Sequence, residues 1–195
     1  MKVITISREY GAGGHTVGRK LAEILGVELY DKDIIASTSK QVGIATKQVE
    51  EAEEEITRTD TFVRSISPIS YDQKDAIFEA EKQFIIDVAK KGPCIILGRG
   101  ADKILEEAGI DSFDVFIYAS DEAREKRVGE LIGSNNISEI RKAIKRHDHA
   151  RKSFYNYYTD RQLGDYRNYN LMIDSSMIGY EKSAEVIAAA VRNAE

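Results

Sequence analysis

Short runs of apolar residues alternate along the chain with longer stretches whose apolar positions recur every three or four residues. The short runs are rich in β-branched and aromatic residues, a composition typical of buried strands. They cover residues 3–6, 27–30, 94–97, 113–119 and 170–174. The longer stretches have helical periodicity and cover residues 16–25, 33–42, 74–91, 121–132 and 181–193. Because strands and helices alternate, the pattern predicts an α/β fold with a parallel sheet covered by helices on both faces.

Two stretches depart from this alternation. Residues 46–58, TKQVEEAEEEITR, are strongly acidic, which indicates a solvated helix, and residues 59–74 predict an irregular continuation. Residues 141–152, RKAIKRHDHARK, have a net charge of +5 in a chain whose total is −5. No linker composition separates either stretch from the rest, so we interpret both as insertions into a single domain. The expected core comprises residues 1–43, 76–132 and 169–195, with a cap at about 44–75 and a lid region at about 133–168.

The composition narrows the classes of function. Of 195 residues, 42% are hydrophobic and 31% are charged, which is enough for both a buried core and a solvated surface. The net charge of −5 argues against binding nucleic acid or anionic membranes over a broad surface, although a local basic patch can hold a small anion. The single cysteine, Cys94, excludes an intramolecular disulfide, and no apolar run is long enough to cross a bilayer. We therefore expect an unprocessed cytoplasmic protein with neither nucleic acid nor a membrane as partner.

The first candidate site is the glycine-rich segment between the first strand and the first helix, residues 7–16, SREYGAGGHT. At the carboxyl end of a parallel strand, glycines let backbone N–H groups surround a phosphate, and the next helix directs its positive end at the same point. A glycine-rich turn can also serve only as a connection. The dinucleotide template GxGxxG fails at Thr16, and the phosphate-loop template GxxxxGKS/T finds Arg8 at its first glycine and Gly14 at its lysine.

A second candidate is Arg99, in the segment GRGAD directly after the strand at 94–97. An arginine at the carboxyl end of a central strand points toward the crevice where open parallel sheets bind ligands, and its planar guanidinium suits a phosphate. The structural alternative is an ion pair with a nearby acid such as Asp102. We favour the ligand-binding interpretation because the end of a buried strand is a poor place for a charge without a function.

The third candidate is the basic run described above. On a helix, Lys142, Arg146 and His149 share one face, and His147 and Arg151 share another. A solvated helix is the ordinary meaning of such a run. Nucleic-acid binding is a third interpretation, which the acidic remainder of the chain disfavours. The two histidines are two residues apart, a spacing that does not suit a shared metal ion on a helix.

Together these segments resemble the cytidylate-kinase-like branch of the P-loop nucleoside-monophosphate kinases, over nearly the whole chain. The phosphate loop of cytidylate kinases reads like GPSGAGKGT, with which REYGAGGHT at 8–16 aligns without a gap. That family's strand ending in an aspartate is similar to the segment ending at Asp31. The family patterns DGRDIGT, FLxASxEERAxRR, RDxxDSxRxxAP and IDTS resemble, in that order, LGRGAD at 97–102, FIYASDEAREKR at 116–127, RHDHAR at 146–151 and IDSS at 173–176.

The resemblance implies a three-layer P-loop NTPase fold with a five-stranded parallel sheet, a helical cap that binds the acceptor nucleotide, and a basic lid. It implies that Arg99 holds the phosphate of the acceptor, and that Arg146 and Arg151 close on the transferred phosphoryl group. The phosphates of ATP would lie on Gly11, Ala12, Gly13, Gly14, His15 and Thr16, with Thr16 also a ligand of Mg²⁺. The other candidates for the acceptor site are Asp31, Arg64, Asp102 and Asp174.

Two departures from the family's pattern bear on the chemistry. Gly14 stands in the place of the lysine that contacts the β- and γ-phosphates, so another cation has to supply that charge. Arg8, at the entrance of the loop, is the substitute that we favour over Arg19 or Lys20 in the following helix. Leu97 replaces an aspartate, and this replacement weakens the expected hold on Mg²⁺.

The expected reaction is ATP + (d)CMP → ADP + (d)CDP with Mg²⁺ and without a side-chain nucleophile. The partners are then ATP and a nucleoside monophosphate, and the oligomeric state stays open. Three alternatives remain at this point. The protein is a P-loop kinase with another small-molecule acceptor, a nucleotide-binding regulator that has lost catalysis with the lysine, or an RNA-binding module.

Overall fold

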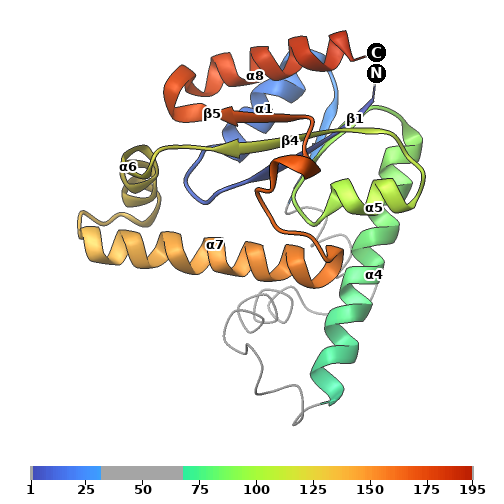
Figure 1. Ribbon diagram of the computed structural model, residues 1–195, viewed down its shortest axis with the longest axis horizontal. Coiled ribbons are helices and arrows are strands. Elements are labelled where there is room, and N and C mark those ends of the chain that lie inside the picture. Colours follow the sequence, from blue (N-terminus) through green and yellow to red (C-terminus); the bar gives the residue numbers. More distant parts are fainter. Residues whose placement is uncertain (1, 32–67, 195) are drawn as a thin grey trace.

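The structure of the protein, a computed structural model, describes residues 2–31 and 68–194 (Figure 1). Strands and helices alternate along both described segments, as the hydrophobic pattern predicts. In chain order they are β1 (Val3–Arg8), α1 (Gly14–Leu25), β2 (Glu28–Tyr30), α4 (Pro68–Lys91), β3 (Cys94–Leu97), α5 (Ala101–Glu107), β4 (Ser112–Tyr118), α6 (Asp121–Ile132), α7 (Ile137–Thr159), the 3-10 helix η2 (Tyr166–Asn168), β5 (Leu171–Asp174) and α8 (Ser175–Asn193).

The strands form one parallel sheet in the order β2-β3-β1-β4-β5. β1 lies at the centre, and Ile6 is opposite both Leu97 of β3 and Val115 of β4. β1 continues past the apolar run that predicts it, because Ser7 and Arg8 still pair with β4. The carboxyl ends of β1 and β3 therefore lie side by side, and the segments that follow them meet at one edge of the sheet.

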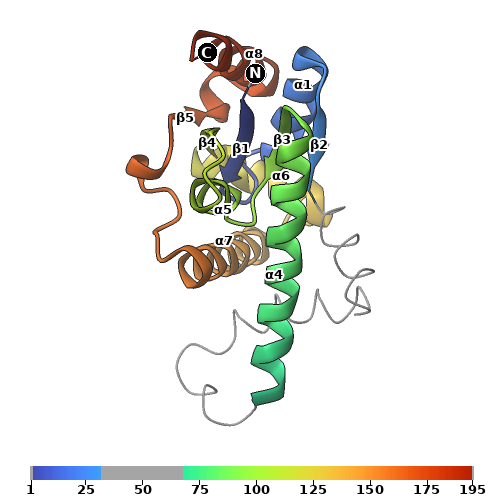
Figure 2. The same cartoon turned by 90° about the vertical axis from the view of Figure 1, so that its right-hand side faces the viewer.

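Helices cover both faces of the sheet, as Figures 1 and 2 show. Successive side chains of a strand point to opposite faces, so β1 contributes to two cores. Ile4 and Ile6 belong to the core that also contains Val17 and Leu21 of α1 and Ile187 of α8. The opposite core is made by α4, α5 and β3 with Val3. The predicted three-layer α/β architecture is thus confirmed.

Several helix boundaries differ from the predicted ones. α4 begins at Pro68 rather than at 74, because proline is well suited to a first helical position, where no intrahelical hydrogen bond needs its missing N–H. The pattern does not predict α5, whose seven residues give too few apolar repeats to be recognised. α8 begins at Ser175, and Gly179 with φ 78° and ψ 163° bends it. The helices expected near 33–42 and 46–58, and the cap up to residue 67, lie outside the described residues.

The basic run lies within α7, a helix of 23 residues. Asn136 caps the start of α7, and its Oδ1 accepts a hydrogen bond from the backbone N–H of Ser138 at 3.0 Å. Near the other end, Phe154 and Tyr158 pack against the core made by α4 and α5. α7 lies on the same side of the sheet as α5, with the basic run toward the end at which β4 and β5 point (Figure 1).

Candidate active site

The loop between β1 and α1 has the backbone that a phosphate site needs. Gly11 and Gly13 have φ angles of 84° and 76°, in the left-handed region that favours glycine. Gly13 caps α1 without a side-chain hydrogen bond, and the first turn of α1 contains no acidic residue. The N–H groups of this turn, which ends at the half-buried Thr16, therefore point toward the loop together with the positive end of the helix dipole. The predicted phosphate-binding residues 11–16 all lie in this loop and turn.

The same glycines let two helices pack closely on the loop. A Cβ at Gly11 would lie 2.9 Å from Cγ2 of Val128 in α6. A Cβ at Gly13 would lie 2.2 Å from Cε1 of Tyr180 in α8. Any other residue at these two positions would be both strained in its backbone and in collision with a neighbouring helix.

Arg8 crosses the space beside Gly14, the position of the missing lysine. A Cβ at Gly14 would lie 2.8 Å from Cγ and 3.0 Å from Cβ of Arg8. At the other end of the arginine side chain, a Cβ at Gly98 would lie 2.2 Å from Nη1. Gly98 directly follows β3, so the guanidinium lies where the carboxyl ends of β1 and β3 meet. The stem of Arg8 thus fills the room that a side chain at position 14 would need.

α7 presents His147 and Arg151 to the loop. The ring of His147 stacks on the ring of Tyr10, with centroids 4.2 Å apart. Cζ of Arg151 lies 5.4 Å from the centroid of the Tyr10 ring, and its Nη1 donates to the backbone oxygen of Arg8 at 3.4 Å. Burial lowers the pKa of the Arg151 guanidinium. Arg146, the other predicted lid arginine, is exposed, so the structure brings only Arg151 of that pair to the loop.

Side chains from two helices hold both backbone groups of Tyr10. Its N–H donates to Oδ1 of Asp148 at 2.7 Å, and its C=O accepts from Nε of Arg124 at 2.8 Å. Arg124 in α6 and Asp148 in α7 also form an ion pair. Nη1 of Arg124 lies 3.5 Å from the carboxylate of Glu9, whose pKa is raised by burial. Arg124 is not among the predicted site residues, and its place in the family-like segment FIYASDEAREKR is the sequence signal that points to it.

Arg99, the predicted ligand of the acceptor phosphate, follows β3. Its φ of 64° is uncommon for a residue with a side chain. Nε of Arg99 lies 3.6 Å from Oε1 of Glu81 in α4, and its Cζ lies 5.3 Å from the centroid of the Phe154 ring in α7. Glu81 is 1% exposed, so a buried carboxylate and an aromatic ring together fix the guanidinium. Arg99 thus forms an ion pair with an acid, as the structural alternative expects, but among the described residues that acid is Glu81 and not Asp102.

Asp102 lies under α7, in the first turn of α5, and is 2% exposed. The hydroxyl of Tyr155 donates to its Oδ2 at 2.5 Å, and Nη1 of Arg161 lies 4.0 Å from the same oxygen. Burial raises the pKa of Asp102 to about 6. These contacts join α5 to α7 and to the segment after it, and they do not bring Asp102 to the phosphate loop.

Of the remaining predicted acceptor residues, the structure describes Asp31 and Asp174, which have different surroundings. Oδ2 of Asp31 lies 2.7 Å from Nε2 of His15, beside the first turn of α1. Asp174 ends β5 and caps α8 by accepting a hydrogen bond from the backbone N–H of Ser176 at 2.9 Å. Arg64 lies outside the described residues. The structure therefore places Asp31 beside the loop and gives Asp174 a capping contact.

A family model described as the cytidylate kinase-like family matches residues 3–177. The chain belongs to the cytidylate kinase-like family. The match includes the phosphate loop, Arg99, α6 and α7. Membership in this family supports a nucleotide-dependent kinase, a phosphotransferase, without identifying the acceptor. A search of curated protein sequences gives no match to this chain.

Solved structures with a similar fold include one uncharacterized protein and several kinases. The uncharacterized protein, from Eubacterium ventriosum ATCC 27560, is 25% identical with a TM-score of 0.72 over 98% of this chain and 99% of that one. A shikimate kinase from Acinetobacter baumannii in complex with shikimate is 16% identical, with a TM-score of 0.54 over 100% and 95% of the two chains. A shikimate kinase from Bacteroides thetaiotaomicron is 15% identical, with a TM-score of 0.56 over 98% of each. These likenesses establish the P-loop NTPase fold of this cytidylate kinase-like protein.

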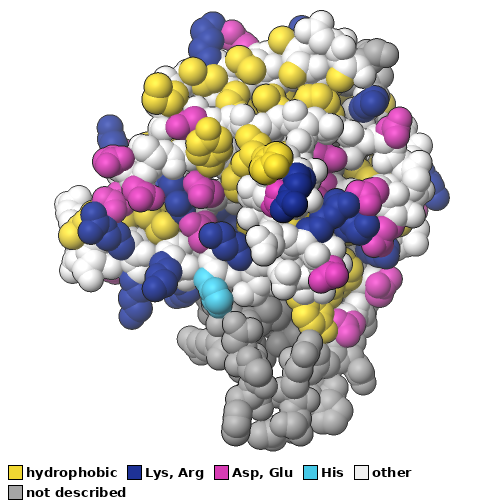
Figure 3. Space-filling model, in the orientation of Figure 1, with side chains coloured by type: hydrophobic (Ala, Val, Ile, Leu, Met, Phe, Trp, Pro, Cys, Tyr) yellow, Lys and Arg dark blue, Asp and Glu magenta, His cyan; other side chains and the backbone are white. Residues whose placement is uncertain are grey.

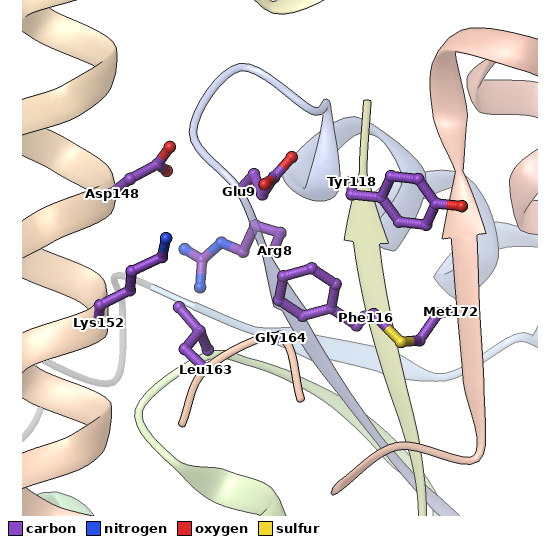
Figure 4. A pocket seen from close by; sticks show the side chains of 9 residues that line it. All are labelled: Arg8, Glu9, Phe116, Tyr118, Asp148, Lys152, Leu163, Gly164 and Met172. Carbon is purple, nitrogen blue, oxygen red and sulfur yellow. The ribbon is translucent and has the colours of Figure 1, made fainter. Parts of the chain in front are cut away.

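A cavity of about 330 Å³ lies beside Arg8 (Figure 4). The sheet order places it on the β4 and β5 side of β1, whereas Arg99 follows β3 on the other side. Figure 4 shows Asp148 and Lys152 of α7 facing Arg8 and Glu9 across the cavity. Residues of β4 and β5, together with residues 163–164, form the rest of the wall, which is largely apolar. The cavity thus combines two positive and two negative side chains with an apolar floor.

The rest of the basic run lies on the surface of this family member. Figure 3 shows Lys and Arg side chains gathered along α7, and Arg141, Lys142 and Lys145 are exposed. The solvated-helix interpretation therefore describes one face of α7, while another face contacts the loop. Within residues 2–31 and 68–194, no group of three or more His, Cys, Asp or Glu is arranged to hold a metal ion, and no helix is long and apolar enough to cross a bilayer.

Proposed function

We propose that this protein transfers the γ-phosphoryl group of ATP to the phosphate of a nucleoside monophosphate, with CMP or dCMP as the expected acceptor. The observation that carries the proposal is the position of Arg8. Its stem takes the room beside Gly14, and its guanidinium lies by Gly98 at the joined ends of β1 and β3. A cation there can neutralise phosphates held by the loop, which is the task of the lysine in the family's pattern.

The phosphates of ATP would bind the backbone N–H groups of residues 11–16, at the uncapped start of α1. Thr16, the third residue of α1, offers a hydroxyl oxygen as a ligand for the Mg²⁺ that accompanies ATP. One side-chain ligand is enough for this ion, because Mg²⁺ in such sites takes its other ligands from phosphate oxygens and water. When bound, the ion supplies charge stabilisation at the phosphate oxygens.

The acceptor phosphate would bind Arg99, whose guanidinium Glu81 and Phe154 fix in place. One oxygen of that phosphate forms a bond to the γ-phosphorus, and the bond from this phosphorus to the bridging oxygen breaks and leaves ADP. No side chain forms a covalent bond, so the protein contributes alignment, positive charge and exclusion of water. Arg8 and Arg151 supply charge on the ATP side. Asp31 and Arg64 remain proposed contacts of the acceptor, as do Asp102 and Asp174.

The test of this proposal is ADP formation from ATP and Mg²⁺ with CMP, dCMP, UMP, AMP or shikimate as acceptor. We expect turnover that depends on CMP or dCMP, and an Arg99→Ala variant whose KM for the acceptor rises about tenfold or more while the KM for ATP stays the same. Arg167→Ala is the matched control, because Arg167 is a surface arginine whose side chain is 73% exposed. ADP formation at the same rate with and without an acceptor would contradict the proposal. So would an Arg99→Ala variant with the same KM for the acceptor as Arg167→Ala.

Two alternatives give different results in the same assay. Turnover with shikimate alone would keep the reaction class and replace the acceptor. A nucleotide-binding regulator without catalysis is favoured by the glycine at position 14. It predicts ATP binding without ADP formation for every acceptor, and Arg8→Ala would then change no rate.

A further inference from the structure

Arg124 and Asp148 form an ion pair, and each of them also forms a hydrogen bond with the backbone of the same loop residue. Tyr10 donates its N–H to Asp148 at 2.7 Å and accepts at its C=O from Arg124 at 2.8 Å. The two charged residues come from different helices, α6 and α7, and they pair with each other as well. The loop conformation is thus specified at a point directly before Gly11, where the chain turns into the left-handed region.

The burial of this pair indicates a geometric role. Arg124 is 6% exposed, and the side chain of Asp148 is 16% exposed. Removing two charges from water has a free-energy cost that their mutual attraction often fails to offset, so such a pair is a weak device for stability. Each member retains hydrogen-bonding capacity, and Tyr10 satisfies part of it with both of its backbone groups. A loop in another conformation would leave those buried charges with poorer partners.

The same pair sets the position of α7 along the loop. Asp148 and Arg151 are three residues apart and therefore share one face of the helix. While Asp148 accepts from Tyr10, Arg151 lies against the backbone oxygen of Arg8 and over the Tyr10 ring. A shift of α7 by one turn would break all of these contacts together.

We infer that Arg124 and Asp148 are positioning residues that hold the phosphate loop in its binding conformation and set Arg151 beside it. Neither side chain has to touch the nucleotide for this effect. The inference rests on the proposed function, because a loop fixed in this way serves phosphate binding.

A simpler role would be to fasten α6 to α7, and the chain contains a matched pair with only that role. Nε of Arg141 in α7 lies 2.5 Å from Oε1 of Glu125 in α6. This second ion pair joins the same two helices, and among the described residues neither Arg141 nor Glu125 forms a hydrogen bond or an ion pair with the loop. Glu125→Ala is therefore the control for Asp148→Ala. Asp148→Asn keeps an oxygen for the N–H of Tyr10 and guards against a variant that fails to fold.

The first experiment is hydrogen–deuterium exchange of the nucleotide-free protein, followed over residues 9–16. We expect exchange there to rise about tenfold in Asp148→Ala and less in Asp148→Asn, while Glu125→Ala leaves it unchanged. Exchange over β3 serves as the internal reference for global unfolding. Equal exchange over residues 9–16 in Asp148→Ala and Glu125→Ala, or no change in either, would overturn the inference.

The second experiment is titration of the same proteins with MgATP by calorimetry. We expect the dissociation constant to rise about tenfold in Asp148→Ala and to stay the same in Glu125→Ala. An equal affinity in both variants would also overturn the inference. If the unaltered protein binds no ATP although the loop exchanges as expected, the proposed function fails and the positioning of the loop by this pair stands.

Discussion

The position of the Arg8 side chain depends on two glycines that are far apart in the sequence, Gly14 and Gly98. Arg8 and Gly14 stand out in the sequence, because both occupy positions where the phosphate-loop pattern has other residues. The role of Gly98 could not be predicted from such a pattern. Its contact with Nη1 of Arg8 arises because β3 pairs with β1, and no local pattern connects residues that are 90 positions apart. The same limit applies to Glu81, whose contact with Arg99 depends on how α4 packs.

Gly98→Ala tests the path of the Arg8 side chain. The new Cβ would lie 2.2 Å from Nη1 of Arg8, so the guanidinium has to move, and we expect kcat of ADP formation to fall about tenfold or more. The φ of 84° at this position also predicts a loss of about 1 kcal/mol in the free energy of unfolding, measured by urea denaturation.

Gly109→Ala separates the two effects of that substitution. Gly109 has a similar φ of 67°, but a Cβ there would meet no atom within 4 Å. We expect the control to lose similar stability and to keep its kcat. A Gly98→Ala variant with full kcat would show that the guanidinium is not needed where the structure places it.

At the scale of elements, α7 shows what periodicity can and cannot predict. Helical spacing correctly groups His147 with Arg151, and both contact the loop. Helical spacing does not show which face of the helix is turned inward. The resemblance gives no such information either, and it assigns Arg146 the same expected role as Arg151. The inward face is decided by packing, since Phe154 and Tyr158 are anchored in the core and Asp148 pairs with Arg124 of α6.

The contact between α5 and α7 predicts a pH-dependent stability. Burial raises the pKa of Asp102 to about 6 in the folded protein, above its ordinary value of 3.8. A raised pKa means that the folded state binds the proton more tightly than the unfolded state. Asp102 therefore makes the protein less stable as the pH rises from about 4 to about 6, by about 3 kcal/mol in total.

Asp102→Asn removes this titration while an amide oxygen can still accept from Tyr155. In urea denaturation, we expect the unfolding free energy of the variant minus that of the wild type to increase between pH 4 and pH 7 and then to stay constant. Glu106→Gln is the control of opposite sign. Lys103 and Arg161 lower the pKa of Glu106, so the wild type loses this stabilisation as the pH falls and Glu106 becomes protonated. The unfolding free energy of Glu106→Gln minus that of the wild type is therefore expected to increase as the pH falls. A difference in unfolding free energy between Asp102→Asn and the wild type that stays the same at every pH would contradict the effect of burial on the pKa of Asp102.

At the scale of the whole molecule, the sheet order assembles a site from distant segments. With β1 between β3 and β4, the phosphate loop lies next to Arg99 on one side and next to the cavity under α7 on the other. The alternation of strands and helices predicts the sheet. The positions of the glycine-rich segment and of Arg99 at the ends of predicted strands, together with the resemblance, predict the phosphate loop and the role of Arg99. The ion pair around Tyr10 follows from neither, because it requires α6 and α7 to be placed in three dimensions.

We propose that Arg8 supplies the charge of the missing lysine, and a double variant that removes the arginine at position 8 and restores a lysine at position 14 tests this role. Gly14 has no positive φ, so its backbone accepts a side chain, but a Cβ there lies 2.8 Å from Cγ of Arg8. Measured as kcat for ADP formation with CMP, Arg8→Gly is expected to lose about 100-fold and Gly14→Lys alone to lose activity through this collision. The double variant, with the arginine removed and the lysine restored, is expected to regain most of the rate. Unchanged turnover in Arg8→Gly, or a double variant no better than Arg8→Gly alone, would contradict the claim.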